Sequence, residues 1–125
     1  MKAVEFKIKT QPWTGWQKEQ AEAKEEKATV KIGDMLYLHS DMAKAVTEPA
    51  VGRADYNFTV SVRDDSVILV PSLPVPVNDQ GGIDLGANRE NIISIAKGES
   101  KRLATPTMDG GTKWEITVED IKEID

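Results

Sequence analysis

The feature that most constrains the fold of this chain is the alternation of apolar and polar side chains that recurs along most of its length. From residue 28 onward, alternating stretches are separated by Gly, Pro, Asn and Asp at a spacing of about ten residues. A period of two places the apolar side chains of each stretch on one face of a half-buried strand. The pattern predicts a mainly β fold, an antiparallel β-sandwich or small barrel of about seven or eight short strands with little helix.

The clearest pair of strands flanks Asp64 and Asp65. Residues 56–63 alternate strictly, and a second apolar stretch begins at residue 67. A turn at the two aspartates makes three facing pairs: Arg63 with Ser66, Val62 with Val67, and Val60 with Leu69. Because the apolar positions then coincide across the hairpin, we expect this register. Asp-Asp is a poorer turn pair than Asn-Gly, which leaves the type of turn open.

Residues 1–28 differ in character from residues 29–125, which we expect to form a single β-rich domain with an acidic C-terminal end. Phe6 and Ile8 lie on the apolar face of an alternating strand. Residues 17–27 have no apolar side chain larger than alanine, so a short solvated helix and a mobile charged linker both remain open. We expect the first 28 residues to form an arm attached to the body.

Four residues of this arm are candidates for binding a partner: Trp13, Trp16, Phe6 and Ile8. The two tryptophans lie at the break between strand and charged segment, where no local periodicity buries them. Tryptophan often dominates binding energy, and a lone strand can add to a neighbour's exposed sheet edge. In the competing hypotheses, the tryptophans cover the open end of the body and the strand pairs within its own chain. Trp114 alternates with apolar residues and is expected in the core.

Composition limits the available chemistry. A length of 125 residues indicates one domain. The chain has no cysteine and a single histidine, His39, which excludes disulfides, thiolate metal sites, cysteine nucleophiles and sites built from several imidazoles of one chain. The acidic excess lies mostly in residues 115–125, so the rest of the chain is close to neutral. Because it lacks a basic stripe, we expect no nucleic-acid binding.

The first residues interrupt every apolar run with charge, so we expect no signal peptide. Charged residues make up 30% of the chain and apolar residues 39%, a balance typical of a globular domain rather than of a membrane span.

His39 is the first candidate for catalysis. It follows an apolar stretch and lies beside Ser40 and Asp41, where a general base with an aspartate orienter is one hypothesis. Adjacent residues of a strand point to opposite faces, which favours instead a histidine at the end of a strand, at the water interface.

Three aspartates in glycine-rich turns, Asp79, Asp84 and Asp109, could supply oxygen ligands for calcium. Aspartate is also a standard turn residue, and we leave calcium binding by these three open. The glycine-rich residues 81–86 lack the spacing of a phosphate loop, and residues 108–111 are expected to form a turn. We expect no catalytic, cofactor or metal site, and predict that the chain is not an enzyme.

Several segments carry a resemblance to a known group of proteins. They are residues 30–38 (VKIGDMLYL), 44–46 (KAV), 51–54 (VGRA), 95–100 (IAKGES) and 114–118 (WEITV). In this order they resemble the strands and last hairpin of small phage head-decoration and virion accessory β-sandwich proteins. The resemblance implies a structural role without a cofactor on an oligomeric particle.

The function expected from the sequence is that of a structural or interaction protein, a phage virion or capsid-accessory component that acts through protein–protein contacts. Its partners would be other protein subunits, copies of itself or a capsid-type protein, and a homo-oligomer is expected. The alternative is a small cytosolic binding module that inhibits or sequesters a host factor. We expect the chain in the virion if the first function is correct, and in the host cytoplasm if the alternative is correct.

Overall fold

The computed structural model describes residues 1–14, 22–39, 45–49, 56–71, 92–104 and 110–124. These residues form strands and turns, with no helix among them. The strands are β1 (Lys2–Thr14), β2 (Lys24–Lys31), β3 (Met35–Leu38), β4 (Tyr56–Arg63), β5 (Ser66–Pro71), β6 (Ile93–Ala96), β7 (Ser100–Ala104) and β8 (Gly110–Glu123).

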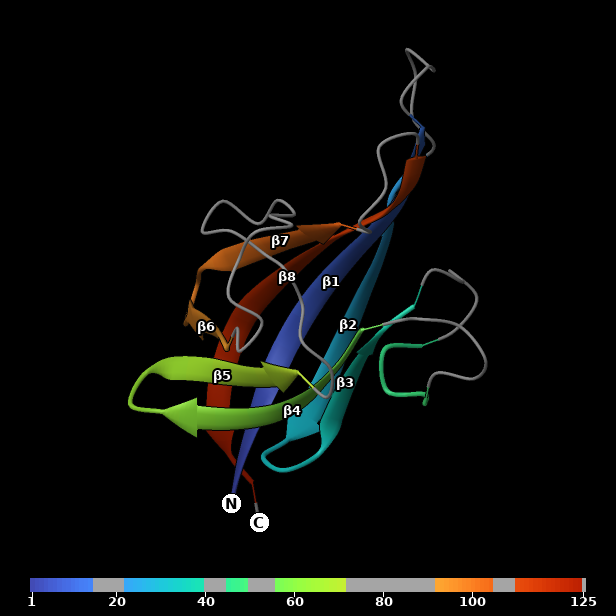
Figure 1. Cartoon of the computed structure of the whole chain (residues 1–125). Helices are drawn as coiled ribbons and strands as arrows, with labels where there is room; N and C mark the ends of the chain where they lie inside the picture. The colour runs from blue at the N-terminus through green and yellow to red at the C-terminus, as the bar shows by residue number, and fades with distance from the viewer. Residues whose placement is uncertain (15–21, 40–44, 50–55, 72–91, 105–109, 125) are drawn as a thin grey trace.

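The strands form two antiparallel sheets of four strands each, in the orders β2-β1-β8-β7 and β3-β4-β5-β6. The prediction of a mainly β fold, a sandwich of about eight strands, is confirmed. We call the sheet β2-β1-β8-β7 the charged sheet, because its outer face carries ion pairs, and the sheet β3-β4-β5-β6 the short-strand sheet. The chain passes from one sheet to the other at two corners, between β2 and β3 and between β6 and β7 (Figure 1).

Each corner contains a glycine in the left-handed region, Gly33 with φ 94° and Gly98 with φ 85°, a conformation that side chains disfavour. Backbone hydrogen bonds fasten the corners: Gly33 donates to the carbonyl of Val60 at 2.8 Å, and Gly98 donates to that of Val118 at 2.7 Å. The first bond ties the β2–β3 corner to β4 of the short-strand sheet, and the second ties the β6–β7 corner to β8 of the charged sheet.

The apolar face of each strand points between the sheets, as the alternation predicts. Trp114 is 1% exposed, which confirms that it belongs to the core. The buried cluster comprises Val4, Phe6, Ile8, Val30, Leu36, Leu38, Val46, Phe58, Val60, Val67, Leu69, Ile93, Ile95, Leu103, Trp114, Ile116 and Val118.

The hairpin of β4 and β5 has the expected register. Arg63 pairs with Ser66, Val62 with Val67, and Val60 with Leu69. Asp64 has a φ of 58°, so the first residue of the turn adopts the left-handed conformation.

The structure corrects the expectation of a separate arm. β1 pairs with β2 from Ala3 to Thr10 and with β8 along its whole length, so it lies inside a sheet of its own chain. Lys24–Lys31 forms a strand, so residues 24–27 are neither a helix nor a linker. All four of these residues are charged, and half-buried positions (Lys24 and Glu26) alternate with exposed ones (Glu25 and Lys27), which is compatible with a strand that has one face in water. Residues 17–21 lie outside the described part of the chain.

Candidate protein-binding surface

β1 and β8 run past the ends of the other strands of their sheet (Figure 1). The pairing of β1 with β2 ends at Thr10 and Lys24, and that of β7 with β8 ends at Ala104 and Lys113. Beyond these points, residues 12–14 pair only with residues 110–112 among the described residues. We call this two-stranded extension the ribbon.

The four residues that the sequence suggests for partner binding do not form one surface among the described residues. Trp13 belongs to it and pairs with Gly111. Trp16 lies outside the described residues. Phe6 and Ile8 are 1% and 0% exposed within the core, so they are not available to a partner. For these two the competing hypothesis is the correct one, because their strand pairs within its own chain.

Pro12 lies beside Trp13 and pairs with Thr112. Proline has no backbone N–H to donate to an added strand, and proteins use it to protect exposed edges. The ribbon is therefore poorly suited to strand addition along β1. The glycines of residues 108–111 predict a turn, whereas residues 110–111 begin β8 and form the second side of the ribbon.

The base of the ribbon is held by a buried cluster around Trp114, which pairs with Thr10. The Trp114 indole Nε1–H donates to the backbone carbonyl of His39 at 3.1 Å. The ring of Tyr56 meets Trp114 edge to face, with ring centres 5.5 Å apart. Burial raises the pKa of the Tyr56 hydroxyl above its ordinary value. These contacts join the charged sheet to the chain around β3 and β4.

His39 is part of the same cluster and follows β3, as expected. It is only 3% exposed, so the expectation of a histidine at the water interface is wrong. The Nε2 atom lies 2.7 Å from the carbonyl oxygen of Glu48, and the ring stacks on Tyr37 with centres 6.2 Å apart. Ser40 and Asp41 lie outside the described residues.

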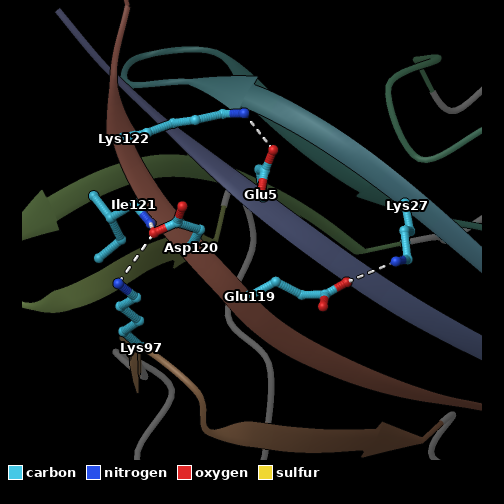
Figure 2. A network of polar contacts seen from close by, with 7 residues as sticks. All are labelled: Glu5, Lys27, Lys97, Glu119, Asp120, Ile121 and Lys122. Carbon is cyan, nitrogen blue, oxygen red and sulfur yellow. Dashed lines mark hydrogen bonds and ion pairs between the residues drawn. The ribbon is translucent and has the colours of Figure 1, made fainter.

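The outer face of the charged sheet carries three ion pairs (Figure 2). Lys122 pairs with Glu5, Lys97 with Asp120 at 3.2 Å, and Lys27 with Glu119 at 3.6 Å. These side chains come from β1, β2, β8 and the turn after β6.

A β-bulge in β8 explains why two adjacent carboxylates join this network. Phe6 pairs with Val118 and Glu5 with Asp120, which leaves Glu119 as the extra residue. The Lys97 ammonium group holds the pKa of Asp120 below its usual range, helped by the backbone N–H of Ile121. The Glu5 carboxylate raises the pKa of Lys122.

The described residues contain no group of three or more His, Cys, Asp or Glu side chains placed to hold a metal ion. Asp79, Asp84 and Asp109 lie outside the described part of the chain, so calcium binding by them stays a prediction. In that described part we also find no helix with the length and hydropathy of a membrane span. Comparisons with family models, curated proteins and solved structures gave no match.

Proposed function

We propose that this chain is a structural protein that acts through protein–protein contacts, as a phage virion or capsid-accessory component. The observation that supports this best is the ribbon, which extends past the sandwich and includes Trp13. Trp16 follows three residues later in the chain. Tryptophans account for much of the energy of many protein interfaces, since each buries a large rigid surface.

The position of the ribbon on the fold supports the same function. Binding elements are commonly carried at the end of a rigid scaffold, where residues can vary without disturbing the core. Here the buried Trp114 cluster lies directly below the ribbon and fixes the direction in which it leaves the sandwich. Pro12 protects the β1 edge from pairing with unrelated strands.

A site of action on a virus particle is what the resemblance to head-decoration and virion accessory proteins implies. Its GDMLYL segment corresponds to the corner at Gly33 and strand β3, and its WEITV segment lies in β8. A chain of this kind would bind a capsid-type subunit through the ribbon and need no cofactor.

The test is mass spectrometry of gradient-purified virus particles produced by the genome that encodes the chain. We expect the full chain in the particles, at a fixed ratio to the main capsid subunit. A double variant, Trp13→Ser with Trp16→Ser, should be lost from the particles while its melting temperature stays close to that of the wild type. Lys9→Ser, on the exposed outer face of β1, is the matched control and should remain bound.

Absence of the wild-type chain from purified particles would overturn the proposal. If the chain instead forms a stable complex with one host protein, the cytosolic binding module is the correct function. Retention of the double variant on particles would show that binding does not depend on the tryptophans of the ribbon.

A further inference from the structure

The two sheets have four edge strands, β2, β7, β3 and β6, and the described residues protect three of them. Exposed edges attract other strands, and proteins block them with inward-pointing charges or with covering chain. An edge strand that lacks both kinds of protection is therefore where a strand of a second chain can pair with the sheet.

The edges of the charged sheet each carry an inward-pointing charge. Glu26 on β2 pairs with the buried Ile8, and its Oε2 accepts the backbone N–H of Val46 at 2.9 Å. Lys101 on β7 pairs with the buried Ile116. Directly paired residues lie on the same face of a sheet, so Lys101 is on the face that packs on the core. The edge of β3 is covered in another way, because Tyr37 donates its backbone N–H to the carbonyl of Val46 at 2.8 Å.

β6 has no such protection in the part of the chain that the structure describes. Its sequence is Ile-Ser-Ile-Ala, without a charge or a proline. Ile93 and Ile95 face the core, whereas Ser94 is exposed. Two exposed large apolar side chains lie beside this edge: Ile92, 60% exposed, and Val70 on β5, 41% exposed.

The backbone of β6 alternates between groups that bond to β5 and groups that face away from it. The two-residue turn makes Arg63 and Ser66 a hydrogen-bonded pair, so Val67 and Leu69 direct their backbone groups toward β6. They pair with Ile95 and Ile93. The bond from the Lys97 N–H to the Asp65 carbonyl, at 3.2 Å, continues this series. The backbone N–H and carbonyl of Ser94 therefore point out of the sheet.

We propose that a second copy of this chain adds to this edge, with the two β6 strands antiparallel about a two-fold axis at Ser94. In this register Ser94 exchanges both backbone hydrogen bonds with its own copy. Ile93 then lies opposite Ile95 of the second copy, and the exposed Ile92 lies opposite Ala96 of the second copy.

This register is self-complementary. Residues directly opposite in an antiparallel pair point to the same face, so the inward isoleucines meet each other and the outward residues meet each other. No charged residue of β6 has to be desolvated, which matters for a chain with a net charge of −5. The result is one continuous sheet that crosses the dimer, an isologous contact of the kind most soluble dimers use. This contact is independent of the ribbon and leaves it accessible for the proposed function.

The absence of cysteine from the chain makes the test simple. Hydrogen-bonded antiparallel residues have Cα atoms about 5.5 Å apart, a spacing that a disulfide bridges without movement. We expect Ser94→Cys to cross-link into a covalent dimer under mild oxidation. Ser100→Cys, which is also exposed but lies on β7, is the matched control and should form no covalent dimer.

Sedimentation equilibrium of the full chain complements the cross-linking. We expect the mass to rise with concentration toward twice the 13.8 kDa of one chain. Ser94→Pro removes an N–H that β5 does not use, so the variant should fold and remain monomeric. Should Ser94→Pro fail to fold, Ser94→Lys provides the same block, because two lysines would face each other on the axis.

A wild-type chain that remains monomeric at all concentrations would overturn the proposal. So would a folded Ser94→Pro or Ser94→Lys variant that still dimerises, or equal cross-linking of Ser94→Cys and Ser100→Cys. The double variant at Trp13 and Trp16 should dimerise as the wild type does. Its loss from particles with the dimer intact tests the ribbon separately from the β6 edge.

Discussion

Trp114 on β8 donates its indole Nε1–H to the backbone carbonyl of His39, 75 residues away in sequence and 3.1 Å away in space. Trp114 belongs to the charged sheet and His39 directly follows β3 of the short-strand sheet, so the bond fixes the position of β8 relative to the chain that follows β3. Because the ribbon begins just beyond Trp114, this contact also sets the base from which the ribbon extends.

Trp114→Phe should lower the free energy of unfolding by about 2–4 kcal/mol. The smaller ring leaves a cavity, and the buried carbonyl of His39 loses its donor. Urea denaturation measures the change, with Glu115→Gln on the outer face of the same strand as the control. A loss below about 0.5 kcal/mol would show that the bond and the packing of this ring contribute little.

Val60→Ala and Leu69→Ala should each cost about 1–4 kcal/mol of stability. Both side chains are fully buried and face each other across the β4–β5 hairpin. Thermal or urea unfolding of the two variants checks this, with Ser61→Ala on the opposite face of β4 as the control. Losses near zero at both positions would contradict their place in the core.

The backbone conformation of the turn between β4 and β5 can be tested separately. Asp64 has a φ of 58°, and a β-branched residue is strongly disfavoured in this left-handed region. Asp64→Val should therefore cost about 1–2 kcal/mol more than Asp65→Val. Equal losses in the two variants, measured by urea denaturation, would contradict the left-handed conformation of residue 64.

The carboxylate of Asp120 provides a prediction on pH. Its pKa lies below the ordinary value because Lys97 bonds to it at 3.2 Å, with help from the Ile121 N–H at 2.9 Å. A carboxyl whose pKa is lower folded than unfolded stabilises the fold above its unfolded pKa, and this contribution is lost as pH falls through the folded pKa. In Lys97→Met, the pKa of Asp120 should rise toward its ordinary value.

Carbon-13 NMR titration of the Asp120 carboxyl measures this pKa directly. The stability difference between wild type and Lys97→Met should close as the pH falls through the folded pKa of Asp120. An unchanged Asp120 titration in the variant would show that Lys97 does not hold the carboxylate.

The β4–β5 hairpin shows what the sequence could predict. A two-residue turn fixes the register on both sides of it, so the facing pairs follow once Asp64 and Asp65 are identified as the turn. Trp114 could also be placed, because alternation assigns a side chain to the core without knowledge of its partner strand.

β1 and β2 show where such prediction ends. Alternation identifies Phe6 and Ile8 as one face of a strand but does not say which strands lie beside it, since the neighbours of β1 include one more than a hundred residues away. Residues 24–27 have helix-forming composition, yet tertiary pairing with β1 overrides that propensity. The bulge at Glu119 appears in the sequence only as a change in apolar spacing, from two residues up to Val118 to three between Val118 and Ile121, and the partner strand is needed to interpret it.

The break in periodicity near Trp13 predicts the end of a strand, and this prediction is wrong. β1 continues to Thr14, and its last residues form one side of the ribbon. The alternation at Phe6 and Ile8 predicts an apolar face but not what covers it, because such a face can pack on its own chain or on another.

We propose the ribbon as the part of this protein that contacts its partner. Amide hydrogen exchange of the chain, free and bound to purified particles, tests this most directly. We predict that new protection on binding is concentrated at the ribbon amides, those of residues 13–14 and 110–112, with the amides of the sandwich core protected equally in both states. Ribbon amides that exchange at the same rate free and bound, with new protection elsewhere, would contradict the account.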